Sequence, residues 1–262
     1  MSAPAEPIIR VEDVTIAYGD RVVLSGVSFE VRRGEVFVIL GGSGCGKSSL
    51  LKHLIGLRRP REGRILIDGR DVTAAEGAER RAILRSFGVM YQSGALFGSL
   101  TVHENVRLPL DELTDLAEGQ KNALALALLR RVGLAHAATR LPAELSGGMV
   151  KRAAIARALA LGPPLVFLDE PSAGLDPITS AGLDALIVDL ARSTGTTFVV
   201  VTHELQSIFA IADRCVMLDA ARRTLVAEGR PPDLRDTSND PQVLRFFRRE
   251  AEDAAPGRSQ TA

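Results

Sequence analysis

A glycine-rich stretch near the amino terminus has the residue types needed to hold a chain of phosphates. Residues 41–48 read GGSGCGKS and fit the whole pattern G-x-x-x-x-G-K-[ST]. An apolar run precedes them, and a sequence with a helical pattern follows. This strand–loop–helix context is the one that the motif requires. Loop N–H groups and the helix amino terminus would surround the phosphates, the lysine would reach the outer ones, and the last serine could ligate Mg²⁺. The candidate residues are Gly41, Gly42, Ser43, Gly44, Cys45, Gly46, Lys47, Ser48 and Ser49.

Two acidic residues end another apolar run. Residues 165–170 read LVFLDE, so Asp169 and Glu170 stand at the end of a predicted strand. Asp169 is suited to hold Mg²⁺, directly or in its outer shell, and Glu170 could polarise a water for attack on a γ-phosphate. General-base help of this kind is worth about 10²- to 10⁴-fold in rate. An isolated Asp-Glu pair is usually a solvated loop, but the phosphate loop in the same chain favours the catalytic interpretation.

Three further side chains are weaker candidates when each is considered alone. His203 follows the strand at 198–202, at a carboxyl end, where the active groups of open parallel sheets lie. Gln92 follows the residues Val89-Met90-Tyr91, and Tyr18 follows a short strand. The ordinary interpretations of the three are a loop histidine, a polar strand end and a core tyrosine.

A second anion-binding pattern lies well after the first. Residues 144–158 read ELSGGMVKRAAIARA, and Ser146, Gly147 and Gly148 open its helical run. A hydroxyl and free N–H groups at a helix start form a ready anion site. No lysine or carboxylate pair of the nucleotide-binding kind accompanies them, so this site looks half-built. The alternative is that Ser146 only caps a helix.

Apolar patterning predicts the strands that position these residues. Residues 27–31 alternate between apolar and polar, which indicates a strand with one solvated face. Ile65–Ile67 followed by Asp68-Gly69 indicates a strand that ends in a turn. Three later runs are continuously apolar, as in a parallel sheet that is covered on both faces. These runs are Val36–Leu40, Leu165–Leu168 and Phe198–Val201.

Helices are predicted between the strands. One begins at Asp176-Pro177, where aspartate can cap and proline suits the first helical position, and it ends near Gly195. Another opens at 101–104 with a capping-box pattern. From about 93 to 162 the strand signal vanishes, which predicts a helical subdomain inserted into the α/β core. A short last helix is expected after Asp240-Pro241.

Composition excludes several classes of protein. The 262 residues are 46% apolar and 24% charged, and 32 basic side chains balance 32 acidic ones, so no net field attracts nucleic acid. The longest apolar stretches are far shorter than the roughly 18 to 20 residues that cross a bilayer. No signal-peptide pattern opens the chain. Cys45 and Cys215 are expected to be free thiols, which fits a reducing cytoplasm.

The order of these features along the chain resembles the ATP-binding cassette (ABC) ATPase family. Residues 8 to 230 contain, in sequence, Tyr18, the phosphate loop, Gln92, LSGGM, LVFLDE, SAGLD and His203. The resemblance implies an α/β P-loop NTPase of the ABC ATPase type, with an N-terminal antiparallel β subdomain and an inserted helical subdomain. It also implies roles for single residues. Tyr18 would stack on adenine, Gln92 would sense Mg²⁺ and the attacking water, His203 would contact the γ-phosphate, and Asp176 would lie in a loop that crosses to a partner subunit.

The same resemblance completes the half-built site. In the family, the serine and glycines of the signature segment, here Ser146, Gly147 and Gly148, bind the ATP held by the phosphate loop of another copy. Two chains arranged head to tail would form two complete sites in a symmetric dimer. ATP and Mg²⁺ are the implied cofactors. ATP would then hold the two copies together and hydrolysis would release them.

A narrower resemblance concerns the transported cargo. Met149 stands where the usual signature has glutamine, and the strings SGGM, QSGALF, GLDPIT and PQVLRFF are similar to the ATPase subunits of Mla-type (Mce-associated) phospholipid transporters. This similarity implies a permease partner in the bacterial inner membrane, with the chain bound to the cytoplasmic face. It further implies phospholipid cargo, a small cytoplasmic regulatory subunit and a periplasmic lipid-binding protein, and no nucleic-acid partner.

Two apolar segments leave their contacts open. Within Ser93–Leu110, an apolar group could be core or a socket for a permease helix, where the family docks it. This group is Ala95, Leu96, Phe97 and Leu100. In the tail, Phe246 and Phe247 could pack on the parent domain, on a membrane or on the second subunit, and family members favour the last. We expect one domain at 1–235 and an extension at 236–262 whose end, APGRSQTA, is disordered.

Two other functions within the family fit the sequence poorly, and a third stays open. A chromosome-maintenance ATPase has a long coiled coil between the phosphate loop and the signature segment, and no sustained heptad repeat occurs there in this sequence. A translation-factor ATPase has two cassettes in one chain, whereas this chain has one. An importer of amino acids or another small solute stays open, because nothing in such a chain touches cargo.

Overall fold

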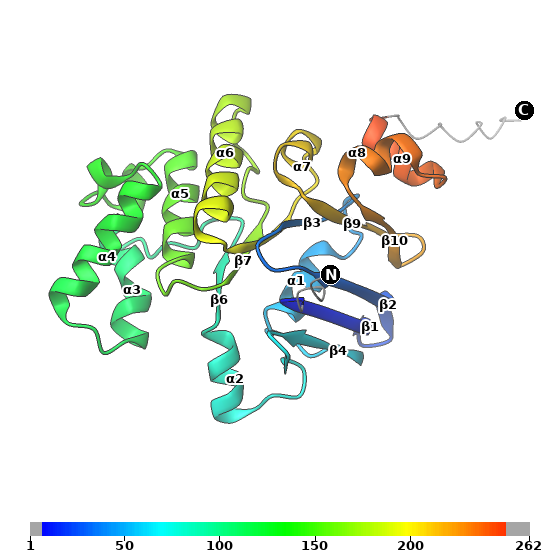
Figure 1. The fold of residues 1–262 in the computed structure, drawn as a ribbon, viewed down its shortest axis with the longest axis horizontal. Coiled ribbons are helices and arrows are strands. Elements are labelled where there is room, and N and C mark those ends of the chain that lie inside the picture. The colour runs from blue at the N-terminus through cyan, green and yellow to red at the C-terminus, as the bar shows by residue number, and fades with distance from the viewer. Residues whose placement is uncertain (1–6, 250–262) are drawn as a thin grey trace, which may run out of the picture.

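The first of two β-sheets is formed by amino-terminal strands in the computed structural model, which describes residues 7–249. Its four strands are antiparallel and follow the order β2-β1-β4-β5 (Figure 1). The strands are β1 (Ile9–Tyr18), β2 (Arg21–Val31), β4 (Glu62–Ile67) and β5 (Arg70–Asp71). In β2 the side chains of Val27, Phe29 and Val31 are buried and their neighbours exposed, as the alternating pattern predicts.

The second sheet is the larger one and runs through the centre of the molecule. Its order is β10-β9-β3-β8-β7-β6, and all neighbours are parallel except β10 and β9. The strands are β3 (Val36–Gly41), β6 (Phe87–Met90), β7 (Leu165–Asp169), β8 (Thr197–Val201), β9 (Arg214–Asp219) and β10 (Thr224–Gly229). The three continuous apolar runs form its central strands β3, β7 and β8, so that prediction is confirmed.

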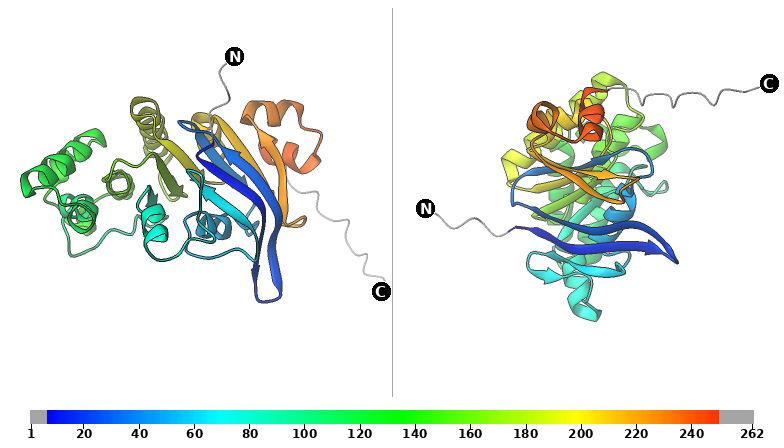
Figure 2. Two further views of the ribbon diagram at one scale, coloured as in Figure 1. Left: turned by 60° about the horizontal axis from the view of Figure 1, so that its bottom comes forward. Right: turned by 90° about the vertical axis from the view of Figure 1, so that its right-hand side faces the viewer.

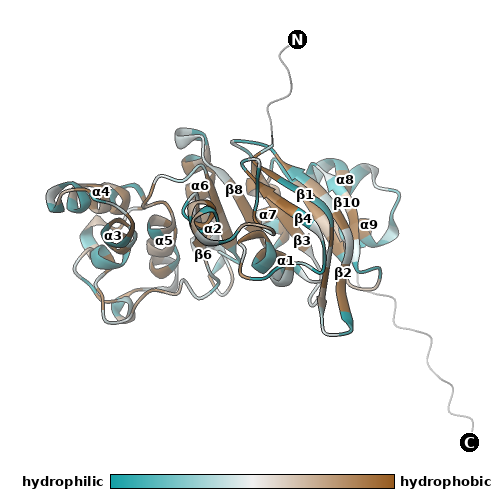
Figure 3. Cartoon of the chain, turned by 90° about the horizontal axis from the view of Figure 1, so that it is seen from below, coloured by the Kyte–Doolittle hydropathy of each residue, from teal (hydrophilic) through white to brown (hydrophobic). Residues whose placement is uncertain are grey.

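Both faces of this sheet are covered, which explains why its strands are apolar throughout. Hydrophobic residues dominate β3 and β8 in Figure 3. Along β3, Val38 and Leu40 belong to the core beneath the helices, whereas Phe37 and Ile39 belong to the core shared with the antiparallel sheet. Side chains of a strand alternate between faces, so a strand between two cores needs apolar residues at every position.

Nine α-helices of the described residues connect and flank the strands. They are α1 (Lys47–Leu54), α2 (Gly77–Leu84), α3 (Val102–Leu113), α4 (Glu118–Arg131), α5 (Gly147–Ala158), α6 (Pro177–Thr194), α7 (Leu205–Ile211), α8 (Pro231–Thr237) and α9 (Pro241–Arg248). The predicted ends of α6 are confirmed, because Asp176 caps its start and Gly195 ends it at φ 69°. Thr101 and Glu104 form the expected capping box of α3.

Helices α3, α4 and α5 fall between β6 and β7 in the chain and gather at one end of the molecule (Figure 2, left). Their position coincides with the predicted helical subdomain at 93–162. Helix α5 packs closely on β6, and a Cβ placed on Gly88 would lie 2.0 Å from the carbonyl oxygen of Ala158. This contact requires glycine at position 88.

The carboxyl-terminal helices pack on the main core. Helix α8 runs across the expected domain boundary at 235, and α9 buries Val243 and Phe247 among residues beneath the larger sheet. The ring of Phe247 makes an edge contact with Phe209 of α7, with 5.8 Å between centroids. Phe247 therefore packs within its own chain, and the expectation that it contacts the second subunit is wrong. The predicted disordered end, APGRSQTA, lies outside the described residues.

Two observations concern the cysteines and the membrane. Cys45 and Cys215 are both free, as predicted, and both are buried. Burial raises the pKa of the Cys45 thiol and raises that of Cys215 to about 12. Among residues 7–249, no helix combines the length and the apolar character needed to span a bilayer.

Candidate active site

The phosphate loop joins the end of β3 to the start of α1. Gly41 has φ 147°, Gly44 has φ 74° and Gly46 has φ 103°, values that side-chain-bearing residues rarely adopt. A Cβ on Gly41 would also lie 2.4 Å from the carbonyl oxygen of Leu218 in β9. The loop therefore needs these glycines both for its turn and for its close approach to the neighbouring strand.

Lys47 is positioned inside this loop. Its Nζ donates to the carbonyl oxygens of Gly41 at 2.9 Å and Gly42 at 3.1 Å, and the residue is 9% exposed. Ser43 and Gly44 are exposed at the rim, and Ser48 is exposed in the first turn of α1. Helix N-termini and a buried cation together form an anion-binding cradle.

The acidic pair stands at the end of β7, next to β8. Glu170 has φ 44°, is 8% exposed, and its Oε1 lies 2.9 Å from Nδ1 of His203. Its other oxygen, Oε2, is buried with no hydrogen-bond partner among the described residues. The structure thus brings together two residues that sequence reasoning assigned to catalysis from separate strand ends.

Asp169 fits a Mg²⁺ site. Burial raises the pKa of the Asp169 carboxyl group, and the charge of Glu170 raises it further. The charges of three nearby lysines lower this pKa but do not cancel the rise. Its Oδ1 is buried and has no partner within residues 7–249. Magnesium usually takes one or two protein oxygens and completes its shell with phosphates and water. Asp169 and the exposed hydroxyl of Ser48 have the chemistry for that role.

Gln92 follows β6 in an exposed loop, and its backbone is held by a residue that the sequence analysis missed. The ammonium of Lys151, in α5, donates to the carbonyl oxygen of Gln92 and to that of Glu170 at 3.2 Å. A lysine in a helical sequence is normally expected to face solvent, so no sequence signal indicated that Lys151 is buried. Its burial appears only once α5 packs against β6.

Tyr18 is the last residue of β1, opposite Arg21 at the end of the β1–β2 hairpin. It is 36% exposed, and the guanidinium of Arg58 lies 4.9 Å from its ring centroid. A Cβ on Gly46 would meet the side chains of Leu24 and Val23 in β2, so the β1–β2 hairpin adjoins the loop. An exposed ring at this position can offer a face to a base.

Ser146 and Gly147 form an exposed helix tip, and Gly148 is buried next to them. Ser146 caps α5, and its Oγ accepts from the N–H of Met149 at 3.4 Å. Gly147 is exposed, and a Cβ on Gly148 would lie 2.4 Å from the γ-methyl of Thr179. The tip therefore lies against the start of α6, where Asp176 accepts two backbone N–H bonds and where hydrogen bonds from Thr179 lower its pKa.

The tip and the phosphate loop are separated within one chain. Helix α5 lies on one side of β6 and β7, and α1 lies on the other (Figures 1 and 3). Gly148 lies against Thr179 in the helix that Asp176 caps, whereas the charge of Lys47 acts on Asp169. The capping bond of Ser146 goes to Met149, so the exposed N-terminal turn at Gly147 stays open to an anion from outside, whereas Gly148 is buried.

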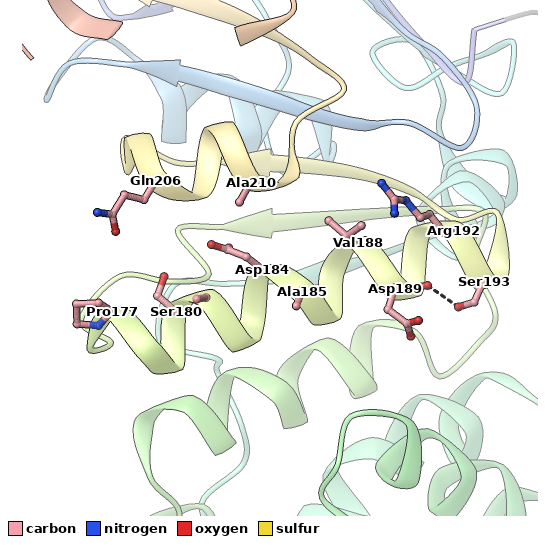
Figure 4. Close-up of a pocket in the computed structure, with 11 residues that line it drawn as sticks. Pro177, Ser180, Asp184, Ala185, Val188, Asp189, Arg192, Ser193, Gln206 and Ala210 are labelled. Carbon is pink, nitrogen blue, oxygen red and sulfur yellow. Dashed lines mark hydrogen bonds between the residues drawn. The ribbon is translucent and has the colours of Figure 1, made fainter. Parts of the chain in front are cut away.

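A separate groove lies between two helices of the larger domain core. A groove of about 840 Å³ runs between α6 and α7, lined by Ser180, Asp184 and Val188 on one side and by Gln206 and Ala210 on the other (Figure 4). Asp184 is 5% exposed, and burial raises its pKa. The groove has one cation, Arg192, beside the carboxylates of Asp184 and Asp189, and it lacks the glycine loop and buried lysine of the cradle at 41–48.

Comparisons with known proteins agree with this geometry. Residues 24–173 match the family described as ABC transporter. The chain is 38% identical over 245 residues to the intermembrane phospholipid transport system ATP-binding protein MlaF of Haemophilus influenzae, which covers 94% of this chain and 92% of that protein. It is 42% identical over 228 residues to the methionine import ATP-binding protein MetN of Rhizobium johnstonii, covering 87% of this chain and 62% of that one.

A solved structure shares the fold. The dimeric ATP-binding cassette MJ0796, bound to ADP and Pi in a post-hydrolysis state, superposes with a TM-score of 0.76 at 32% identity. The superposition covers 85% of this chain and 98% of that chain. The predicted α/β P-loop fold of the ABC ATPase type, with its antiparallel β part, is confirmed.

Proposed function

Because the chain belongs to the ABC transporter family and hydrolyses ATP, we propose that it powers phospholipid transport at the bacterial inner membrane. It binds ATP, and two copies and a membrane permease form the transporter. We further propose the cargo, the roles of single residues and the additional partners described below. The exposed Ser146 tip, on a helix that packs against β6 and α6 rather than against α1, is the observation that supports a shared site most directly.

The ATP phosphates would lie in the cradle of residues 41–48. Lys47 would exchange its bonds to two loop carbonyls for bonds to the outer phosphate oxygens. Ser48 and Asp169 would hold Mg²⁺, which when bound neutralises charge that develops on the phosphates. Tyr18 would stack on the adenine, because its ring is exposed and belongs to the hairpin whose second strand contacts Gly46 of the loop.

Glu170 would act on the attacking water. Its carboxylate stands at a strand end beside the cradle, and Oε2 has no partner among the described residues. This oxygen has no lone pair engaged by the described residues, and it would accept a proton from a water admitted with the nucleotide, as general-base catalysis requires. His203 holds the other oxygen at 2.9 Å and so orients the carboxylate. Gln92 would place its amide near the same water.

The second copy would close the site. Its Ser146, Gly147 and Gly148 would donate to the γ-phosphate from across the interface, while Asp176 would lie at the crossing loop. A closed two-fold arrangement makes both sites equivalent. Binding of ATP then supplies the energy for closure, and hydrolysis removes the shared phosphate that joins the copies.

Phospholipid is favoured as cargo by two features. One is the Met149-containing signature with its accompanying strings, and the other is the match to the phospholipid transport protein over almost its full length. The match to the methionine import protein, at 42% identity, supports a small-solute importer as the second candidate. The chain would bind the cytoplasmic face through a permease, with a lipid-binding periplasmic protein and a small regulatory subunit as further partners.

Purification from native membranes separates the two cargoes. The chain would be isolated with its permease, its partners identified by mass spectrometry, and bound lipid measured by thin-layer chromatography. A six-helix-type permease with a lipid-binding periplasmic partner supports phospholipid transport. A partner that binds amino acids or sugars contradicts it and leaves ATP hydrolysis in place.

A further inference from the structure

Lys151 is a buried cation that reaches into the site from the signature helix. It lies just after the tip at 146–148, on α5, and is 6% exposed. Its Nζ donates to the carbonyl oxygens of Gln92 and Glu170, which belong to two different loops. One ammonium group thus joins the ends of β6 and β7.

The contacts of Lys151 differ from those of an ordinary buried lysine. Lys121, 9% exposed in α4, is paired with the carboxylates of Asp111 and Glu118. Lys151 has only backbone carbonyls as partners within the described residues, and burial lowers its pKa while Asp169 and Glu170 counteract that effect. Burying an ammonium opposes folding unless the group is paired and hydrogen-bonded, so this position is a poor choice for stability alone.

The backbone that Lys151 holds is constrained from other directions as well. The N–H of Glu170 donates to Val201 at 2.8 Å, and the N–H of Ala173 donates to the Glu170 carbonyl at 3.2 Å. Together with Lys151, these bonds fix the peptide groups on both sides of a residue in the left-handed region, at φ 44°. The carboxylate orientation follows from this backbone.

The loop after Gln92 is attached to the same helix at a second point. Arg157 donates to the carbonyl oxygens of Ala95 at 2.8 Å and Gly94 at 2.9 Å. A Cβ on Gly94 would lie 2.9 Å from the side chain of Val150. Residues 92–95 therefore lie along α5, and a shift of this helix would move the loop with it.

We propose that Lys151 is a positioning residue, whose ammonium sets the spacing between the Gln92 loop and the Glu170 carboxylate during hydrolysis. The inference rests on the proposed roles of those two residues. The helix tip that contacts the partner's nucleotide and the lysine that holds the catalytic loops are on one rigid helix. Lys151 would act on the chemical step rather than on ATP binding, because it contacts the main chain of Gln92 and Glu170 and has no hydrogen bond to the phosphate cradle or to the Glu170 carboxylate among the described residues.

The test is a comparison of variants in the full chain with Mg-ATP. Lys151→Met removes the ammonium with little change in length, and Lys121→Met is the matched buried-lysine control. We expect Lys151→Met to lower kcat by about 10- to 100-fold, the effect of a small misplacement of reacting groups. KM and the Kd of a fluorescent ATP analogue should stay within about threefold of the parent. Lys151→Arg should recover most of the rate.

The outcomes separate this inference from the proposed function. A kcat of Lys151→Met within about threefold of the parent, or an equal loss in Lys121→Met, contradicts the positioning role. Normal hydrolysis by Glu170→Gln in the same assay contradicts the catalytic assignment itself, whatever Lys151→Met does. If Lys151→Met does not fold, Lys151→Gln replaces it, with reduced kcat and unchanged KM again expected.

Discussion

Replacing Glu170 by glutamine should slow ATP hydrolysis by about 10²- to 10⁴-fold, the usual effect of removing a general base. The amide has the size and shape of the carboxylate, so the contact with His203 at 2.9 Å can be kept. What is lost is the basic oxygen Oε2, which has no partner among the described residues. ATP should still bind, because the cradle around Lys47 is untouched.

Stability should change in the opposite direction from activity. Glu170 is 8% exposed, and its unpartnered oxygen is buried. An unsatisfied buried polar group costs about 1–3 kcal/mol, and more when it is charged. A neutral amide lowers this penalty, so the Tm of Glu170→Gln should equal or exceed that of the parent. A slow and stable variant cannot be explained by misfolding.

The assay combines turnover with molecular mass. Phosphate release would be measured under single-turnover conditions, and light scattering would follow the mass with Mg-ATP and with Mg-ADP. Glu170→Gln should form a dimer with ATP and remain so, while the parent returns to its initial mass after hydrolysis. Glu62→Gln, an exposed exchange in β4, is the control and should match the parent. A variant that stays monomeric with ATP would refute the shared site, and parental turnover would refute the role of Glu170.

Three further predictions test other parts of the structure. Lys47→Ala should abolish hydrolysis in the assembled transporter, because the cradle loses its cation; normal phosphate release would exclude this loop as the ATP site. Gly88→Ala should lower the free energy of unfolding by about 3 kcal/mol in urea melts, because its Cβ would lie 2.0 Å from the Ala158 carbonyl oxygen. Gly98→Ala, with no atom within 4 Å of its Cβ, should leave the melt unchanged. Asp184→Asn should raise the Tm at neutral pH. Burial raises the pKa of the Asp184 carboxyl group, so the folded state loses stability as the pH rises from 3.8 through that higher value. The gain in Tm should vanish as the pH falls toward 3.8, and a gain that is independent of pH would contradict this linkage.

Much of this fold is encoded in local patterns. The runs at β3, β7 and β8 are apolar at every position, which only a strand between two cores requires. The ends of α6 depend on Asp176 and Gly195, whose chemistry acts within one turn of the chain. These features could be predicted because their causes lie in neighbouring residues.

Contacts between distant segments could not be predicted in the same way. Nothing in the amino-acid sequence around Lys151 indicates that the carbonyl groups of Gln92 and Glu170 would accept hydrogen bonds from it. Likewise, Phe247 packs against Phe209 because α9 folds back beside α7, and no local pattern reports that return. The roles of His203 and Gln92 depended on the order of motifs, since each residue type is ambiguous alone.

The shielded thiols make this protein suitable for site-directed labelling. Maleimides attack thiolates, and the two native sulfur atoms are both inaccessible and hard to ionise. A cysteine introduced at Ile178, where the native side chain is 86% exposed, would react first without removal of the others. A fluorophore or spin label there would follow the approach of the twin molecule in real time, on an otherwise unaltered background.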